Sequence, residues 1–245
     1  MRKQAITHVK TVWVMGASGG IGAAFAAEIR PACPNCYLVG LARNPSAVDT
    51  AVFDEVHALD LLAPQQWPET LACISHRPDW LLIATGLLHN EVYQPEKTYR
   101  SLSADHLQLS FQINAQAPAL LIQAVLLRFG HRSPIKIGVL SARLGSISDN
   151  QLGGWHSYRA SKAALNMLIK NIAIELHAKR APITVFAIQP GTTDTRLSQP
   201  FQKHLPPGQL QSAEFTAQKI QQLFVSADGR ISGLLIDFEG HIISP

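Results

Sequence analysis

Short apolar runs alternate with helical segments along the whole chain, and this alternation most constrains the fold. The runs at 37–41 and 80–84 contain hardly any polar residue, which is typical of strands buried on both faces. Strands joined by helices in this order form right-handed βαβ units and a parallel sheet covered on both sides. We therefore expect one doubly wound α/β domain over residues 1–245. The expected strands, about seven, are 9–15, 37–41, 56–59, 80–84, 135–140, 183–188 and 233–238; the expected helices are 21–30, 65–76, 104–129, 158–178 and 213–224.

A glycine-rich loop lies between the first expected strand and the first expected helix. Gly16, Gly20 and Gly22 have the spacing Gly-x-x-x-Gly-x-Gly, and Ser18 and Ile21 lie between them. Glycines at such a turn let backbone N–H groups approach a pyrophosphate, which then faces the positive end of the helix. The loop therefore predicts a dinucleotide site of the Rossmann type, although glycine-rich turns also occur as plain connections.

The ends of the next two strands bear on which dinucleotide is bound. An acidic residue at the end of the second strand selects NAD, whereas an arginine there accommodates the 2′-phosphate of NADP. Here the strand runs into Ala42-Arg43-Asn44, with no carboxylate. We expect Arg43 to favour NADP(H) over NAD(H), the alternative being a solvated surface charge. Asp60, after the third strand, is placed to accept from the adenine amino group or to cap a helix.

Tyr158 and Lys162 are four residues apart on the most strongly predicted helix, and hence on one face of it. A phenol with a pKa of about 10 is a poor base at neutral pH, but a nearby ammonium favours the phenolate. Such a tyrosine could donate a proton to a developing alkoxide or accept one from an alcohol. A catalytic role for this pair is favoured because the pair occurs together with the glycine loop and Arg43.

With these motifs the chain resembles the short-chain dehydrogenase/reductase family over nearly its whole length. The nucleotide loop matches at Gly16, Gly20 and Gly22, and the family's Tyr-x-x-x-Lys matches at Tyr158 and Lys162. The loop 145–154 with the helix start resembles the C-factor and sniffer-like carbonyl reductase group. The resemblance implies an NADP(H)-dependent oxidoreductase that transfers a hydride between the nicotinamide and a carbonyl or alcohol substrate.

The family's Pro-Gly segment after the sixth strand matches Pro190 and Gly191. By resemblance, Ile188 and Thr193 would contact the nicotinamide carboxamide, and Thr195 would contact the phosphates.

The resemblance also implies roles for single polar residues near the reacting atoms. Asn114 matches the helix asparagine that supports a water-linked proton relay to the lysine. Gly86 keeps the glycine of the family's Asn-Asn-Ala-Gly segment, whose asparagines are absent here. The serine that usually orients the substrate carbonyl falls on Ala142, so Ser141 and Ser146 are both candidates, with Ser141 narrowly preferred as the catalytic one.

Composition limits the partners of this enzyme. The net charge of +4 comes without clustered basic residues, so we expect no nucleic-acid partner. No stretch reads as a bilayer span and residues 1–10 lack the apolar core of a secretory signal, so we expect a cytoplasmic protein without a membrane partner. The family's oligomers imply a homodimer or homotetramer through the helices 104–129 and 155–178.

The remaining expectations concern the cysteines and one long loop. Cys33 and Cys36 form an isolated Cys-x-x-Cys without a second pair or a histidine cluster, so we predict neither a metal site nor a structural disulfide. The proline-rich stretch 197–211 is expected to be a lid over the substrate. Because the usual serine is missing, a rival reading is a signalling or sensing protein that binds the cofactor but has weak or lost catalysis.

Overall fold

The computed structural model describes residue 6 and residues 8–245, so the expectation about a secretory signal falls largely outside the described residues. Its main sheet has eight strands in the order β10-β9-β6-β5-β4-β1-β2-β3, and every pair is parallel except β9 with β10. The strands are β1 (Thr11–Met15), β2 (Tyr37–Ala42), β3 (Glu55–Ala58), β4 (Trp80–Ile83), β5 (Ile135–Leu140), β6 (Ile183–Gln189), β9 (Leu235–Asp237) and β10 (Ile242–Ile243). The doubly wound fold is thus confirmed, with one short antiparallel edge strand beyond the seven expected.

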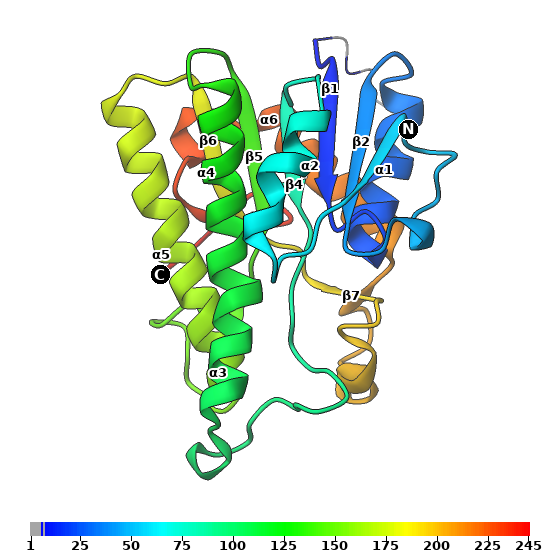
Figure 1. The fold of residues 1–245 in the computed structure, drawn as a ribbon. Helices are drawn as coiled ribbons and strands as arrows, with labels where there is room; N and C mark the ends of the chain where they lie inside the picture. Colours follow the sequence, from blue (N-terminus) through cyan, green and yellow to red (C-terminus); the bar gives the residue numbers. More distant parts are fainter. Residues whose placement is uncertain (1–5, 7) are drawn as a thin grey trace.

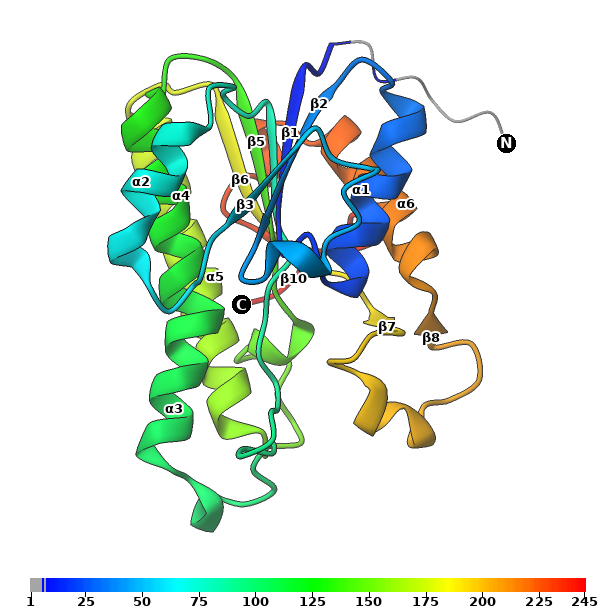
Figure 2. The ribbon, with the colours of Figure 1, turned by 45° about the vertical axis from the view of Figure 1, so that its right-hand side comes forward.

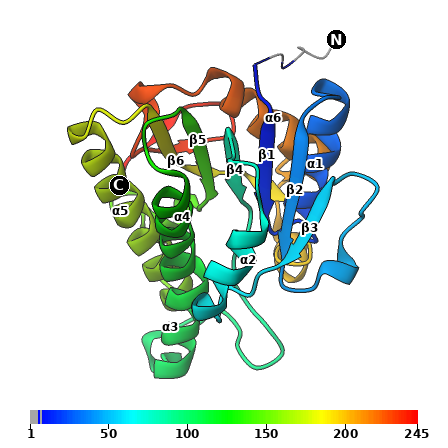
Figure 3. The ribbon, with the colours of Figure 1, turned by 45° about the horizontal axis from the view of Figure 1, so that its top comes forward.

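Helices cover both faces of this sheet (Figure 1). α1 (Gly20–Ala32) and α6 (Ala213–Ser226) lie together on one face. α2 (Trp67–Cys73), α4 (Ala117–Phe129) and α5 (His156–Ala178) cover the other face, with α3 (Ala104–Phe111) extending beyond the sheet below α4. The three layers are plain when the molecule is turned about the vertical axis (Figure 2) and about the horizontal axis (Figure 3).

The strands build two apolar cores because successive side chains point to opposite faces. In β1, Val12 and Val14 pack toward α1 and α6, whereas Trp13 and Met15 pack toward the other helices. β4 divides its side chains in the same way. A sheet buried on both faces holds its strands rigidly, so the loops at their carboxyl ends have fixed starting points.

Residues 104–129 form one continuous helix in three parts: α3, a π-helical turn η4 (Gln112–Gln116) and α4. The helix has 26 residues, and a window of 18 residues within it has a mean hydropathy of 1.2, so it is long and apolar enough to cross a membrane, contrary to the expectation that no segment is. Leu121, Ile122 and Val125 of this helix are fully buried against the sheet. A helix in the core of a folded domain can therefore be as long and apolar as a membrane-spanning one. The irregular part of this helix, the π-helical turn, lies just before Pro118.

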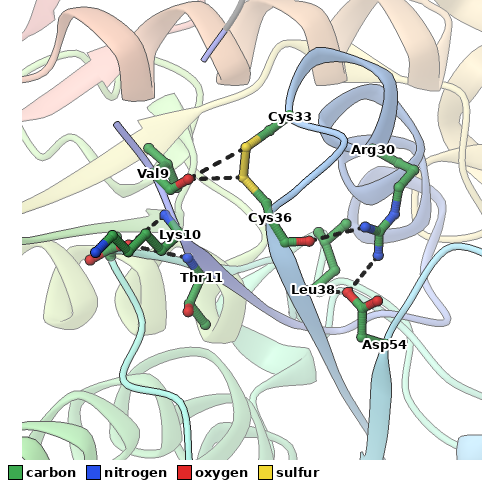
Figure 4. Close-up of a disulfide and its surroundings, with 9 residues drawn as sticks. Val9, Lys10, Thr11, Arg30, Cys33, Cys36, Leu38 and Asp54 are labelled. Carbon is green, nitrogen blue, oxygen red and sulfur yellow. Dashed lines mark hydrogen bonds and ion pairs between the residues drawn. A yellow bond between two sulfur atoms is a disulfide. The ribbon is translucent and has the colours of Figure 1, made fainter. Parts of the chain in front are cut away.

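The structure corrects the prediction for the cysteines, because Cys33 and Cys36 form a disulfide (Figure 4). The chain turns tightly between the end of α1 and β2: the Cys36 N–H donates to the Cys33 carbonyl oxygen at 3.0 Å. This turn brings the two Cα atoms to 5.4 Å, within the range that a disulfide spans. Both sulfur atoms face the carbonyl oxygen of Val9. The spacing alone could not show that the turn closes so sharply.

The loops that matter for function gather at the carboxyl ends of the strands, at the bottom of Figure 1. The long segment 84–103 leaves β4 there and returns to the start of α3. The expected lid, 197–211, contains a short 3₁₀ helix, η6 (Gln199–His204), and the strand β8 (Leu210–Gln211), which pairs with β7 (Thr192–Thr193). Ligands of doubly wound folds bind at this edge of the sheet.

Candidate functional site

The glycine loop turns the chain from β1 directly into α1. Gly16 has a φ of +93°, and a Cβ on Gly22 would lie only 2.2 Å from the Gly16 carbonyl oxygen. α1 begins after Gly19 without a side-chain cap and without an acidic residue in its first turn. Its first N–H groups and positive end are therefore available to an anion, as a pyrophosphate requires.

The segment after β6 closes over this loop. A Cβ on Gly20 would lie 2.7 Å from the Thr195 Cγ2 atom, so the glycine and the threonine are in direct contact. Gly191 has a φ of +79°, which lets the chain turn after Pro190 toward the loop. Thr195 thus lies where the resemblance puts a phosphate contact, whereas the hydroxyl of Thr193 is already bonded to Thr216 at 2.8 Å.

Arg43 is exposed at the carboxyl end of β2 and makes no hydrogen bond or ion pair within the described residues. Its guanidinium is free to meet a phosphate at the ribose end of a dinucleotide. Asp60, after β3, uses one carboxylate oxygen to accept from the Leu62 N–H at 3.0 Å. That contact stabilises a turn and does not cap a helix, because the N-cap residues of η2 (Pro64–Gln66) and α2 are Ala63 and Gln66; it leaves the other carboxylate oxygen unused.

Tyr158 and Lys162 lie in the first two turns of α5, facing the carboxyl end of β5. The Lys162 Nζ atom donates to the Leu140 carbonyl oxygen at 2.8 Å and lies 5.8 Å from the centroid of the Tyr158 ring. The Tyr158 hydroxyl makes no hydrogen bond within the described part of the chain. The two side chains are therefore brought together as predicted, and the phenol is left open to a substrate.

Burial shifts the pKa values of this pair in opposite directions. Lys162 is 2% exposed, and desolvation lowers its pKa to about 7. Tyr158 is 9% exposed, and desolvation raises its pKa to about 12. The phenol therefore keeps its proton at neutral pH, whereas the amine is poised to exchange one.

Asn114 lies in the π-helical turn, a distortion that is frequent at functional sites. Its side chain bonds both backbone groups of Leu87, accepting at 2.7 Å and donating at 2.8 Å, and also donates to the Ser161 hydroxyl at 3.0 Å. Pro118, four residues later, has no N–H to donate to the Asn114 carbonyl oxygen. Asn114 thereby ties the helix to the loop after β4 beside the Tyr/Lys pair.

Gly86 lies between these groups and the proposed lid. A Cβ there would be 3.6 Å from Asn114 Oδ1 and 3.7 Å from both Lys162 Nζ and Leu197 Cδ1. The neighbouring Thr85 hydroxyl is buried and has no hydrogen-bond partner among the residues that the structure describes. Buried polar groups normally have a hydrogen-bond partner, so this hydroxyl, next to the glycine loop at Gly16, is suited to bind a polar group of a ligand.

The two candidate serines do not face Tyr158. Ser141 donates its hydroxyl hydrogen to Asn166 Oδ1 at 2.7 Å, and the Ser146 hydroxyl accepts from the Asp149 N–H at 3.1 Å. Ala142 instead packs against Tyr158. Because neighbouring residues of an extended segment point to opposite sides, an inward Ala142 turns Ser141 away. The structure therefore does not bring the predicted Ser141 to the reacting end of the site.

An apolar cluster surrounds Tyr158 on the substrate side. Its members are Leu88, Ala142, Leu144, Trp155, Leu197 and Phe201. The leucines were missed because single leucines in loops carry no periodic signal, and only the fold brings them together.

Comparison with known proteins agrees with this geometry. The model of the short chain dehydrogenase family matches residues 10–206. A benzil reductase, (S)-benzoin forming, of Bacillus subtilis is 29% identical over 188 residues, covering 75% of this chain and 74% of that protein. A 1-hydroxy-2-glutathionyl-2-methyl-3-butene dehydrogenase of a Rhodococcus species is 37% identical over 103 residues. Those residues are 41% of this chain and 43% of that enzyme, so less than half of the enzyme's length is matched.

Solved structures show the same fold. Carbonyl reductase Sniffer of D. melanogaster superposes with a TM-score of 0.82 at 19% identity, covering 97% of this chain and all of that one. A short-chain dehydrogenase/reductase from Burkholderia multivorans with bound NADP superposes with a TM-score of 0.80 at 26% identity, over the same shares of the two chains.

Proposed function

Since the chain belongs to the short chain dehydrogenase family, we propose that it is an NADP(H)-dependent carbonyl reductase in which Tyr158 is the proton donor. One observation carries this proposal: a phenol that makes no hydrogen bond within the described residues lies beside the buried amino group of Lys162, at the edge of the sheet where the glycine loop also ends. The chain is thus an oxidoreductase whose acid is already in place.

The bound nicotinamide would supply the hydride to the carbonyl carbon. Tyr158 gives its proton to the carbonyl oxygen as negative charge develops there, and it regains a proton from the side of Lys162. By the family resemblance, Asn114 would support a water-linked proton relay to Lys162. Because burial keeps the pKa of Tyr158 near 12, the group is protonated at neutral pH, which suits reduction of a carbonyl better than oxidation of an alcohol.

The cofactor site uses backbone groups for the pyrophosphate and Arg43 for the ribose. The uncapped start of α1, at Gly20, Ile21 and Gly22 with Ser18 before them, would hold the pyrophosphate, and Thr195 would close over it. Arg43 has no internal partner and would bind the 2′-phosphate of NADP, a group whose charge and geometry suit a guanidinium. The NADP-bound relative from Burkholderia supports this preference.

Residues at the edges of the dinucleotide complete the proposed site. Asp60 would meet the adenine with its unused oxygen, Gly86 would allow close approach, and Pro190 and Gly191 would flank the nicotinamide end. Thr193 would take part through its backbone, because its hydroxyl is bonded within the protein.

We propose that the substrate is an uncharged carbonyl compound with bulky apolar groups. The side chains packed around Tyr158 are leucine, tryptophan, phenylalanine and alanine, which suit apolar groups of a substrate. Segment 197–211 contributes two of these side chains, Leu197 and Phe201, as expected of a lid. The similarity to a benzil reductase, whose substrate is an aromatic diketone, supports an apolar substrate.

The proposal is tested by following NADPH absorbance with aromatic diketones, ketones, aldehydes and quinones for the wild type and Tyr158→Phe. Loss of one acid in the transition state lowers kcat by about 100- to 10,000-fold, while NADPH binding stays unchanged. Tyr99→Phe, which removes an exposed hydroxyl, is the matched control and keeps full activity. Equal turnover by Tyr158→Phe and the wild type would rule out Tyr158 as the acid.

The missing serine favours a second candidate, a cofactor-binding sensor with weak catalysis. No hydroxyl stands beside Tyr158 at position 142, and one lost oxyanion donor lowers the rate of other enzymes about 100- to 1,000-fold. Tight NADPH binding with no turnover on any carbonyl of the panel would favour the sensor over the reductase.

We further propose a cytoplasmic homodimer or homotetramer that buries the outer faces of α4 and α5. These faces carry exposed apolar side chains, among them Leu127 (79% exposed), Met167 (61%) and Ile174 (56%). Light scattering after size exclusion measures the mass directly, and Leu127→Glu with Ile174→Glu would yield monomers.

A further inference from the structure

A buried cluster of ionisable and polar groups lies next to the active-site helix and has no part in the chemistry proposed above. Glu96, from the loop after β4, is 3% exposed, as is His106 on α3. The His106 Nδ1 atom lies 3.1 Å from Glu96 Oε1. Ser157, fully buried at the start of α5, donates its hydroxyl hydrogen to the same carboxylate oxygen. Three separate segments of the chain thus meet at one carboxylate.

Glu96 holds the first turn of α5, which no residue of the helix's own start caps. The N-cap position is Trp155, in the left-handed conformation with φ of +49°, and it provides no side-chain hydrogen bond. Glu96 Oε2 accepts from the Ser157 N–H at 3.2 Å, and the Glu96 carbonyl oxygen accepts from the Trp155 N–H at 2.5 Å. The carboxylate therefore does from a distant loop what an N-cap side chain does locally.

The backbone just before α5 has an unusual conformation, which brings it against the loop that carries Glu96. Gly153 and Gly154 have φ of +63° and +65°, so three residues in a row are left-handed before α5 begins. A Cβ on Gly154 would lie 3.4 Å from the Glu96 carbonyl oxygen. The glycines let the chain pass close over the loop that carries Glu96 and enter the helix at Trp155.

The charge of Glu96 is compensated inside the cluster. Burial by itself raises the pKa of this carboxyl, but the hydrogen bonds from Ser157 and the charge of His106 outweigh burial, so its pKa is lowered. The ring of Tyr93 stacks on His106 at 4.8 Å with an interplanar angle of 3°. Glu96 is therefore held as a carboxylate, and the histidine that faces it is fixed in turn.

Serine, histidine and glutamate are also the residue types of a hydrolytic triad, but this arrangement does not fit one. The serine hydroxyl bonds to the carboxylate and makes no hydrogen bond to His106 in the described structure. All three side chains are buried, so no substrate reaches the serine. The cluster is a support and not a second catalytic centre.

We propose that Glu96, fixed by His106, is a positioning residue for the reductase: by holding Ser157 it sets the first turn of α5 and thereby places the adjacent Tyr158 hydroxyl. This inference rests on the proposed function, because Tyr158 must be the acid for its placement to matter. Displacement of a reacting group by about 1 Å can lower a rate by about 100-fold. Because Ser157 directly precedes Tyr158, loss of the carboxylate that holds Ser157 would be felt in the chemical step.

The test compares Glu96→Ala, Glu96→Gln and Ser157→Ala with the wild type, with Glu91→Ala as the matched control. Glu91 is an exposed carboxylate in the same loop. For each variant, kcat and KM are measured with the best ketone of the panel, NADPH affinity by fluorescence and melting temperature by circular dichroism. Tyr158→Phe is measured alongside, so that failure of the proposed acid is seen separately.

We expect Glu96→Ala to lower kcat by about 10- to 100-fold, with NADPH affinity and KM little changed. Glu96→Gln recovers most of kcat, because its amide oxygen still accepts from the Ser157 N–H. Ser157→Ala lowers kcat less than Glu96→Ala does. The double variant Glu96→Ala/Ser157→Ala has a kcat no lower than that of Glu96→Ala, because both substitutions break the same contact.

Wild-type kcat in Glu96→Ala, with Tyr158→Phe inactive, would overturn the positioning role and leave the proposed function intact. Equal losses of kcat and NADPH binding, with a lowered melting temperature and no recovery in Glu96→Gln, would also overturn it, because they show general destabilisation. Where Glu96→Ala does not fold, Ser157→Ala decides: a lower kcat at unchanged NADPH affinity supports the role, and unchanged kcat contradicts it.

Discussion

The two halves of the site depend on different kinds of contact. One half would hold the dinucleotide, and the other would carry out the chemistry. Around the glycine loop the contacts are made by backbone and by the absence of side chains, at Gly16, Gly20 and Gly22. Around α3 and the start of α5 they are made by buried ionisable side chains. Of the described residues, the buried ionisable ones lie on this side: Glu96, His106, Tyr158 and Lys162.

This difference explains how each half can fail. The glycine loop binds a ligand through the close approach of its backbone. A methyl group added to one of its glycines therefore destroys the site, whereas a substitution far from the loop leaves it intact. Buried ionisable groups depend on their mutual placement and on their charge states, so they respond to pH and to the loss of a single partner.

The largest effect is expected from adding one methyl group to the glycine loop. In Gly22→Ala the new Cβ would lie 2.2 Å from the Gly16 carbonyl oxygen, so the turn must open. Losing two charge-assisted hydrogen bonds of about 1.5 to 3 kcal/mol each weakens NADPH binding by about 100-fold or more. Fluorescence titration measures the affinity. Gly229→Ala, where no heavy atom would lie within 4 Å of the new Cβ, is the control and binds normally.

The next prediction separates the contribution of Arg43, the proposed charged contact of the cofactor, from that of the glycine loop. Arg43→Ala removes a single charge-assisted contact and should weaken NADPH binding by roughly 10- to 100-fold. NADH binding should stay the same, because that cofactor has no 2′-phosphate. Titration with both cofactors measures the change, and Arg132→Ala, another exposed arginine, serves as control. Equal loss for the two cofactors would show that Arg43 is not the selective residue.

The chemical half should reveal its buried amine as a dependence of stability on pH. Burial lowers the pKa of Lys162 to about 7 in the folded protein, so the unfolded chain binds the extra proton between that pH and its ordinary value. Stability therefore rises with pH in this window, by about 2 kcal/mol between roughly pH 7 and pH 9. Urea unfolding measures this rise, which should vanish in Lys162→Met. Parallel curves for the two proteins would contradict the depressed pKa.

The smallest effect restores the hydroxyl that the substrate side lacks. Ala142→Ser places a donor next to Tyr158, where the apolar cluster now presents a methyl group. We expect kcat/KM for ketones to rise by about 10-fold, less than the full value of an oxyanion donor in an evolved site. Ala142→Cys, of similar size but a weak donor, is the control. A similar gain in both variants would point to shape and not to hydrogen bonding.

Much of the dinucleotide half could be predicted because its signals are local. The glycine spacing, the strand before it and the helix after it all lie within residues 9–30. The Tyr158/Lys162 pair was predictable for the same reason, since five consecutive residues of one helix define it. Short edge strands such as β10 were not, because two residues carry no periodic signal.

The supports of the chemical half could not be predicted, because they join distant segments. Glu96 is one acidic residue in a polar loop, and its partner Ser157 is 61 residues away. The orientation of Ser141 depended on the inward turn of its neighbour, Ala142. The π-helical turn at Asn114 has no sequence signature beyond the proline that follows it.

The turn closed by Cys33 and Cys36 bears on where such a protein can work. The bond spans only two intervening residues, so it removes little freedom from the unfolded chain, about 2 kcal/mol in the loop-entropy model. Most of the anchoring of this corner comes from Arg30, whose guanidinium bonds the carbonyl oxygens of Cys36 and Val52 and the carboxylate of Asp54. The corner would therefore keep its shape under reducing as well as oxidising conditions.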